Sequence, residues 1–184
     1  MPILEMVILV VTTVVIVYIS RGSLRDPRSH GFYRAFAWEA ILILIVLNLD
    51  EWFHDPWSWH QIVSWILLTV SFFLVIHVVQ LLRSVGRPDP QRNDGPLLGL
   101  EKTTVLVTTG AYGFIRHPAY ASLLFLAWGT FFKGPALTGG LLGLAATLFL
   151  VATARTEETE NVRYFGPAYV EYMKRTRMFV PFVF

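Results

Sequence analysis

Long apolar segments separated by short polar ones dominate the pattern of this chain. Five such segments can be read, at residues 2–20, 35–49, 59–82, 118–132 and 135–154. Apolar segments of about 20 residues with almost no charge are typical of helices that cross a bilayer. The pattern therefore predicts an all-α integral membrane protein with about five transmembrane helices.

The fourth segment is shorter than the others. At about 1.5 Å per residue it extends about 22 Å, less than the roughly 30 Å of a hydrocarbon core. Only Lys133-Gly134-Pro135 separates it from the fifth segment. We therefore expect the two to form a short hairpin. Gly139 and Gly143 suit close approach, either within this hairpin or to a second copy of the chain, so the oligomeric state is left open.

Composition supports a membrane protein and excludes several other classes. Hydrophobic residues make up 54% of the chain and charged residues only 15%, against about 25% in a typical soluble domain. The chain has no cysteine, which excludes disulfides, thiolate metal sites and cysteine nucleophiles. Glu5 lies near the start of the first segment, and no small-residue cleavage site follows. We therefore expect a retained transmembrane helix, not a signal peptide.

The basic residues are sorted by loop, which predicts an orientation. Of the 15 Lys and Arg residues, all but Lys133 lie in the loops after the first and third segments and in the tail. The opposite loop carries Asp50, Glu51 and Asp55 instead. Cytoplasmic loops are enriched in Lys and Arg, so the N-terminus is expected outside and the C-terminus in the cytoplasm. The sequence pI near 9.0 thus reflects membrane topology, and no nucleic-acid partner is expected.

Two polar regions complete the organisation. Residues 86–104 are rich in Gly, Pro, Asp and Asn and are typical of a loop. Residues 157–172 have helical composition interrupted at Phe165-Gly166-Pro167, which predicts a cytoplasmic helical tail with a break there. The length of 184 residues suits one domain, residues 1–184.

The segment from Gly110 to Tyr120 concentrates polar and aromatic side chains at the start of the fourth segment. Pro118 suits the first turn of a helix, and the free N–H groups of such a turn form an anion site. Arg116 and His117 add donors beside it. The alternative is that Arg116 only fixes topology and His117 only caps the helix.

An acidic pair, Glu157 and Glu158, directly follows the fifth segment. The alternative for this pair is a solvated helix end, but helix C-termini disfavour acidic charge, so a carboxylate there suggests a cationic partner. Together the two clusters suit a ligand that carries both a positive and a negative charge. S-adenosylmethionine fits, because its carboxylate and sulfonium have opposite charges and its adenine can stack on Tyr112 and Tyr120.

Four motifs resemble the isoprenylcysteine carboxyl methyltransferase family, whose relatives include phospholipid N-methyltransferases. They cover roughly residues 80–184, and their order and spacing match the family. In sequence they are Leu106–Tyr112, Arg116–Tyr120, Glu157-Glu158, and Phe165–Tyr172 with Pro181.

The resemblance implies an all-helical membrane enzyme that uses S-adenosylmethionine and a lipophilic or lipidated acceptor reached from the bilayer. Residues 1–82 would form three N-terminal transmembrane helices and residues 83–184 the catalytic half. The expected site residues fall into two groups. Those holding the cofactor are Leu106, Val107, Tyr112, Arg116, His117, Pro118, Tyr120 and Glu157, and those acting in catalysis are Glu157, Glu158, His117 and Arg155.

The chain also departs from the family pattern. The arginine expected one turn before the first glutamate, where it would meet a substrate carboxylate, is Thr153 here. Arg155 would point about 200° away from that position. Glu160 and Asn161 stand in a stretch where the family has an aliphatic residue. The identity of the methyl acceptor is therefore left open. A carboxylate acceptor needs no general base, whereas an amine acceptor would be deprotonated with the help of Glu157, Glu158 or His117.

Other polar residues have two interpretations each. Glu39 is either a substrate contact within the second segment or a partner of Arg34. His77, three residues before Gln80, contacts either substrate or another helix. His54, His60 and Asp55 suit the membrane interface better than a metal, and we expect no metal site. Four tryptophans fit an outer aromatic belt, and two tyrosines are expected to pack the tail: Trp52, Trp57, Trp59 and Trp65, and Tyr169 and Tyr172.

Two rival functions are kept. A nicotinamide-dependent membrane reductase of the sterol reductase type would need a larger basic site for a 2′-phosphate. A non-catalytic ligand-binding membrane protein would bind S-adenosylmethionine without turnover, or not at all. The remaining expected partners are membrane lipids.

Overall fold

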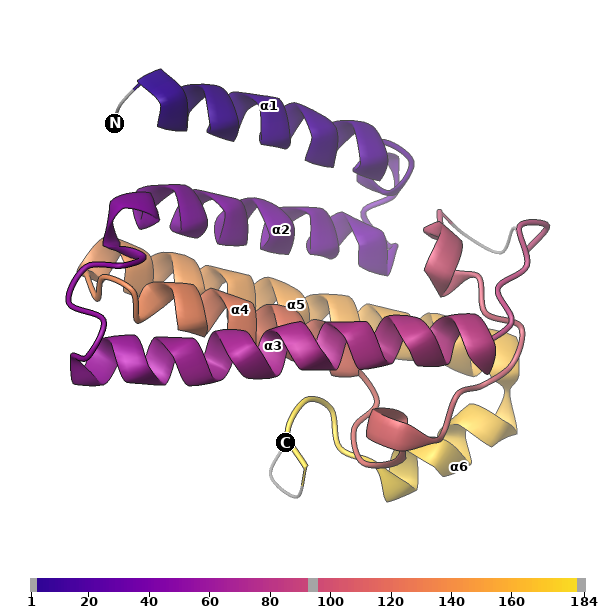
Figure 1. Cartoon of the computed structure of the whole chain (residues 1–184). Helices are drawn as coiled ribbons and strands as arrows, with labels where there is room; N and C mark the ends of the chain where they lie inside the picture. Colours follow the sequence, from indigo (N-terminus) through magenta and orange to yellow (C-terminus); the bar gives the residue numbers. More distant parts are fainter. Residues whose placement is uncertain (1–2, 93–95, 182–184) are drawn as a thin grey trace.

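The computed structural model describes residues 3–92 and 96–181, and within them the chain is helical (Figure 1). The elements, in chain order, are α1 (Ile3–Ser20), η1 (Ser23–Arg25), α2 (His30–Leu47), η2 (Leu49–Glu51), α3 (Trp59–Ser84), η3 (Gly99–Glu101), η4 (Gly110–Gly113), α4 (Pro118–Phe131), α5 (Leu137–Phe165) and α6 (Pro167–Arg175). The expected all-α fold is confirmed for these residues. Residue 2 of the first segment and residues 93–95 of the expected loop lie outside them.

Four helices are long and apolar enough to cross a membrane: α1, α2, α3 and α5. The protein is therefore an integral membrane protein. Helix α4 has 14 residues, about 21 Å, and is too short for a complete crossing by that measure. The expectation of a short fourth helix was right, but five complete spans are not confirmed.

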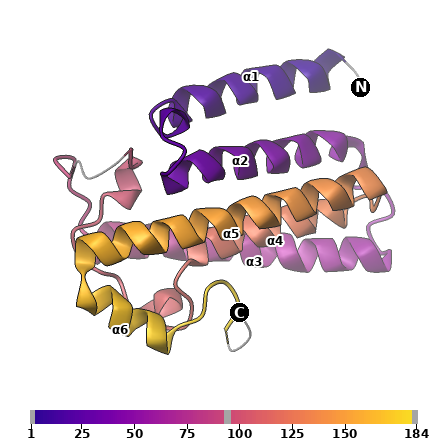
Figure 2. The ribbon, with the colours of Figure 1, turned by 180° about the vertical axis from the view of Figure 1, so that it is seen from behind.

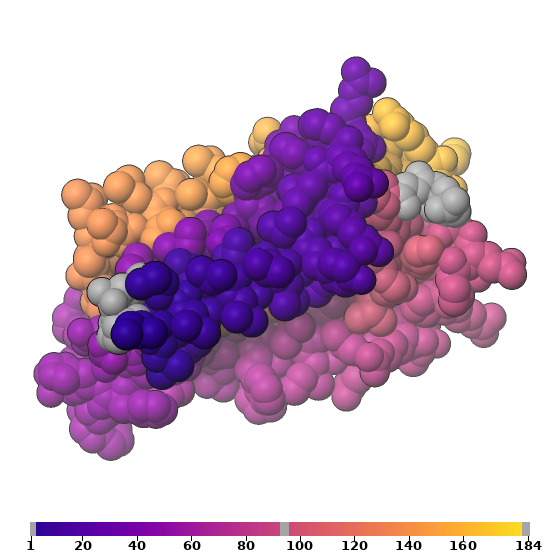
Figure 3. All heavy atoms as spheres, turned by 90° about the horizontal axis from the view of Figure 1, so that it is seen from above, coloured from indigo at the N-terminus to yellow at the C-terminus, as the bar shows by residue number. Residues whose placement is uncertain are grey.

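The long helices lie side by side in both ribbon views (Figures 1 and 2). Helix α2 packs against α5, and α3 packs against α4, which in turn contacts α5. Helix α1 packs mainly on α2 and lies across one face of the molecule (Figure 3). Only 6% of its span is buried, so most of its apolar surface faces outward.

Small and polar residues bring the helices together, as is usual where lipid supplies no hydrophobic driving force. Ala40, Ala127 and Ala146 meet between α2, α4 and α5. Between α3 and α4, the Ser64 hydroxyl donates to the Gly129 carbonyl oxygen and the Ser71 hydroxyl to that of Ser122, both at 2.7 Å.

The glycines of α5 face the hairpin partner. A Cβ at Gly139 would lie 3.4 Å from the Phe131 ring, and one at Gly143 would lie 3.8 Å from that of Trp128. Both rings belong to α4, so these glycines serve the α4–α5 hairpin within the chain, and Gly139 also allows close approach to Leu44 of α2, 3.4 Å from the same Cβ position.

Helix α5 continues eleven residues beyond the apolar segment that predicted it, as far as Phe165. The expectation that Glu157 and Glu158 follow the helix was therefore wrong: both lie within it. The helix continues because five of the eleven residues from Arg155 to Phe165 are Glu or Arg, which are good helix formers, and the three glutamates contact neighbouring elements. The predicted break is confirmed at Gly166, whose φ of +62° suits glycine, and Pro167 starts α6.

Candidate functional site

The short α4 leaves room for a site beside the longer α5. The two helices are antiparallel neighbours joined by residues 132–136, so the last turns of α5 extend past the start of α4. His117 caps that start, and the residues around it are held by the tail. The amide of Arg116 donates to the Arg177 carbonyl oxygen at 2.7 Å, and that of His117 donates to Met178 at 3.1 Å.

This pairing changes the expected anion site. The amides of Arg116 and His117 are already occupied by the tail, and Pro118 has none. Any anion at the start of α4 would therefore meet the first-turn amides of Ala119 and Tyr120 and the side chains around them.

Four charged side chains form the centre of the site. Arg116 Nε donates to Glu158 Oε1 at 2.6 Å. His117 lies between the two glutamates, with Nδ1 3.3 Å from Glu157 Oε2 and Nε2 3.2 Å from Glu158 Oε1. His117 is 4% exposed, so these contacts are made in a largely water-free environment. The sequence motifs from residues 116–117 and 157–158 are thus brought together.

The carboxylates of Glu157 and Glu158 change the pKa of His117. Burial alone would lower the pKa of His117, but hydrogen bonds with Glu157 and Glu158 and their negative charges outweigh it and raise the pKa above its usual value. The imidazole ring also stacks on Tyr120, with centroids 5.4 Å apart. His117 is therefore held in place with its charged form favoured.

A cavity of about 110 Å³ opens beside this centre. Its walls come from the end of α3, the loop before α4, the start of α4, α5 and α6. They include seven of the eight residues expected to hold the cofactor: Leu106, Val107, Tyr112, Arg116, His117, Tyr120 and Glu157. The eighth, Pro118, is buried at the first position of α4.

Tyrosines supply the aromatic part of the wall. Burial, with the charge of Glu157 nearby, raises the pKa of Tyr112, so its hydroxyl stays protonated. The Tyr172 hydroxyl donates to the Tyr112 carbonyl oxygen at 2.7 Å, which fixes η4 against α6. For Tyr169 and Tyr172, packing of the tail was preferred to a role in catalysis; both line the cavity.

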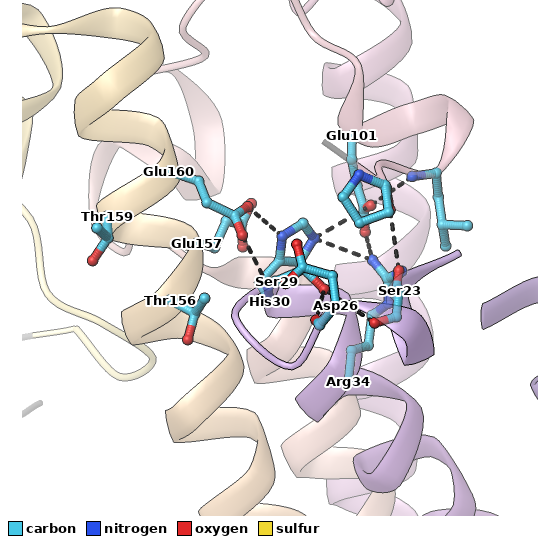
Figure 4. Close-up of polar contacts among 12 residues, drawn as sticks. Ser23, Asp26, Ser29, His30, Arg34, Glu101, Thr156, Glu157, Thr159 and Glu160 are labelled. Carbon is cyan, nitrogen blue, oxygen red and sulfur yellow. Dashed lines mark hydrogen bonds and ion pairs between the residues drawn. The ribbon is translucent and has the colours of Figure 1, made fainter. Parts of the chain in front are cut away.

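A second charged cluster supports the cavity from α2 (Figure 4). Arg34 forms an ion pair with Glu101, a cavity residue, and His30 Nε2 lies 3.4 Å from the same carboxylate. On its other side, His30 Nδ1 contacts Glu160 Oε2 of α5 at 2.5 Å. Arg34 is 2% exposed, and its Nε and Nη2 have no hydrogen-bond partner among the described residues, although the guanidinium lies 4.9 Å from the Trp38 ring centroid. The cluster connects α2, α5 and η3.

Arg155 is not part of the cavity. It is exposed and lines a separate hollow with Arg28 and Arg163. Two residues before Glu157 on the same helix, it points about 200° away, which is why the two side chains reach different surfaces.

The residues expected to contact substrate are also placed elsewhere. Thr153 is buried and its hydroxyl donates to the Phe149 carbonyl oxygen at 2.7 Å. Glu39 accepts a hydrogen bond from the Thr13 hydroxyl at 2.7 Å instead of pairing with Arg34. His77 Nε2 accepts from the Ala111 amide at 3.3 Å, so it anchors η4 to α3. None of the three lines the cavity.

Sequence reasoning missed Glu101 as a cavity residue and Arg34 and His30 as its supports. Glu101 lies in a turn-rich loop, and its ion pair spans 67 positions of the chain. No local pattern marks such a contact. An ionisable residue close to an apolar segment, as Arg34 is, was the available signal.

No protein-family model matches the chain. Several curated proteins, however, are similar to it in sequence. The chain is 30% identical to the human protein-S-isoprenylcysteine O-methyltransferase over 133 residues, 69% of this chain and 45% of that protein. It is 31% identical to a methanethiol S-methyltransferase from Pseudomonas deceptionensis over 120 residues, 64% of this chain and 42% of that protein. The chain is a homologue of these methyltransferases.

The resemblance to the isoprenylcysteine methyltransferase family is thereby confirmed. A third relative, methanethiol S-methyltransferase 2 from Bradyrhizobium diazoefficiens, is 35% identical over 75 residues, 40% of this chain and 27% of that protein. This methyltransferase homologue thus spans less than half the length of these curated relatives. Its cavity gathers residues from all the motifs that carry the resemblance except Pro181.

Proposed function

We propose that the chain is an integral-membrane methyltransferase that binds S-adenosylmethionine in the cavity beside His117 and methylates a lipophilic acceptor. The observation that carries the proposal is the meeting of Arg116, His117 and Glu157 in one aromatic-walled cavity. The relatives act on acceptors as different as isoprenylcysteine and methanethiol, and each name denotes a methyltransferase. This favours a methyltransferase over the nicotinamide-dependent reductase.

The donor set of the cavity fits S-adenosylmethionine. The first-turn amides of α4 suit its carboxylate, with the positive charges of Arg116 and His117 beside them, and Glu157 suits the cationic groups. Tyr112 and Tyr120 offer aromatic faces to the adenine. The enclosed volume of about 110 Å³ is smaller than the roughly 300–1,000 Å³ of most small-molecule sites. Binding therefore requires a wall to move, and the non-helical residues 102–107 form the wall best able to do so.

When bound, S-adenosylmethionine supplies a methyl group on a positively charged sulfur. The protein residues then have three tasks: to hold the cofactor, to align the acceptor and to exclude water. The favoured charged form of His117 suits anion binding better than proton removal.

We further propose that the site faces the cytoplasm. The cavity lies at the end of the bundle where the arginine-rich loops meet, and cytoplasmic loops carry the excess of Lys and Arg. The acceptor would reach it along the apolar surface of the helices. This arrangement suits a lipophilic or lipidated molecule.

The test is binding of methyl-labelled S-adenosylmethionine to the purified protein. Because Glu157 makes charge-assisted contacts in the cavity, Glu157→Gln should weaken binding by about 10- to 100-fold. The control is Glu171→Gln, which removes an exposed carboxylate paired with Lys174 on α6. Equal binding by wild type and Glu157→Gln would remove Glu157 from the site.

Turnover is tested separately, by adding native lipid extract and identifying the labelled product. The proposal expects label in a lipophilic molecule or a lipidated protein. Binding of the cofactor without any labelled product would favour a ligand-binding protein instead.

A further inference from the structure

A basic hollow of about 550 Å³ lies between the start of α2 and the last third of α5. Its rim carries three exposed arginines, Arg28, Arg155 and Arg163. Among the described residues, none of the three guanidinium groups has an ion-pair or hydrogen-bond partner; only the backbone amide of Arg28 contacts Asp26. The hollow thus holds three guanidinium groups against one carboxylate, that of Glu160.

The one carboxylate in the hollow is already occupied. Glu160 accepts from the His30 amide at 2.9 Å through Oε1 and contacts His30 Nδ1 through Oε2. Both oxygens are turned toward His30 (Figure 4). Glu160 therefore forms no direct ion pair with the arginines, and its single negative charge leaves the three guanidinium groups in excess, which favours an external anion.

The spacing of the side chains along α5 makes the arginines converge. Arg155, Thr159 and Arg163 are four residues apart and so share one face of the helix. Arg28 approaches the same space from the chain before α2. Guanidinium groups match phosphate oxygens in a planar, bidentate geometry, so the hollow suits a phosphate group.

The position of the hollow, where the apolar part of α5 ends, indicates that the phosphate belongs to a lipid. The part of α5 before Arg155 carries no charged residue, so Arg155 stands where the apolar segment ends. Beneath it, apolar surface continues on both helices. Phe36 stacks on Phe149 with centroids 5.4 Å apart and remains 40% exposed, and Leu148, two turns before Arg155, is 62% exposed.

We propose that this hollow binds the phosphodiester headgroup of an anionic membrane lipid, with the acyl chains along Phe36 and Leu148. The site lies on the face of α5 turned away from Glu157. It is therefore separate from the cavity proposed for the methyl donor and does not depend on that function.

The experiment uses the purified full chain in detergent, titrated with phosphatidylglycerol or with phosphatidylcholine of the same acyl chains. Retained lipid is counted by native mass spectrometry. Wild type should prefer phosphatidylglycerol. Each arginine near an anionic surface is worth roughly a fivefold change in affinity, so Arg155→Gln with Arg163→Gln should weaken phosphatidylglycerol binding by roughly 25-fold.

The matched control removes two other exposed arginines from the same end of the bundle, Arg83 of α3 and Arg175 of α6. It makes the same change in net charge and should retain the lipid. An equal loss in the control would show that binding follows overall charge, and equal retention of phosphatidylcholine would show no headgroup site. Displacement of the lipid by an equal concentration of inorganic phosphate would identify an ion site. Any of these results would overturn the proposal.

Discussion

His117 combines a structural and a functional position. Its ring stacks on Tyr120, its amide is bonded by the tail, and both ring nitrogens contact glutamates. The sequence singled out His117 and the glutamate pair Glu157-Glu158 as candidate site residues. Because about 40 residues separate them, their contact had to be inferred from charge complementarity and family resemblance.

The raised pKa of His117 predicts how stability varies with pH. Stabilisation by the charged imidazole is fully present below the usual histidine pKa of about 6.5 and is lost as pH rises through the higher folded-state pKa. The melting temperature of wild type should exceed that of His117→Gln by about 2–4 °C at pH 6, and the difference should shrink toward pH 9. Thermal unfolding in detergent measures it. A difference that stays constant over this range would exclude the ionisation of His117 as its cause.

Arg34, which is buried, forms an ion pair with the partly exposed Glu101 between α2 and the cavity wall. Glu101→Gln leaves the buried Arg34 charge unpaired and should lower the free energy of unfolding by about 3–5 kcal/mol, and Arg34→Met should lower it by less, because the carboxylate that remains can be hydrated. The double variant should lose less than the sum of the two, by about 0.5–3 kcal/mol, because the charges are removed together. Additive losses in denaturant unfolding would show that the pair is not coupled.

At the scale of elements, boundaries with strong local signals were predictable and the others were not. Pro118 marked the start of α4, and the Gly166-Pro167 pair marked the break before α6. The end of α5 was missed because the apolar pattern stops near Ala154 while the helix continues as a polar one. Hydrophobic periodicity reports burial in lipid and carries little information where a helix leaves it.

The η4 turn offers a test of how an element positions the site. Gly110 has φ +59°, and a Cβ there would lie 2.6 Å from His77 Nε2. Gly110→Ala should displace η4, lower the free energy of unfolding by about 1–3 kcal/mol and weaken S-adenosylmethionine binding through Tyr112. Gly99→Ala is the control, since a Cβ there meets nothing within 4 Å. Unchanged binding by Gly110→Ala would show that η4 does not position the cofactor.

For the whole molecule, the sequence predicted the helical membrane architecture but not the contacts between distant segments. Lys133, expected only as the basic residue on the opposite side, is fully buried: its Nζ donates to Gln61 Oε1 at 2.9 Å and lies 3.5 Å from the Trp65 ring centroid. Trp52 and Trp65 were both expected in the outer aromatic belt. Their rings also contact the Lys133 cation. Such contacts depend on how helices pack, which single-sequence patterns do not encode.

The absence of cysteine makes the proposed orientation directly testable. His54 and Lys174 have exposed side chains and lie at opposite ends of the bundle. His54→Cys should react with a membrane-impermeant maleimide in intact cells, and Lys174→Cys only after the membrane is permeabilised. The unsubstituted chain is the control for background labelling. The reverse pattern would place the cavity on the outside.

The pairing of residues 116–117 with residues 177–178 also has a consequence for synthesis. A ribosome makes the chain from its N-terminus, and the bundle can begin to assemble as each helix enters the membrane. The strand-like contact that fixes His117 cannot form until Met178 has emerged, after helices α1 to α6 have been made. The pocket therefore matures after the helices of this bundle, and a nascent chain inserted in the bilayer has these helices before it has its site.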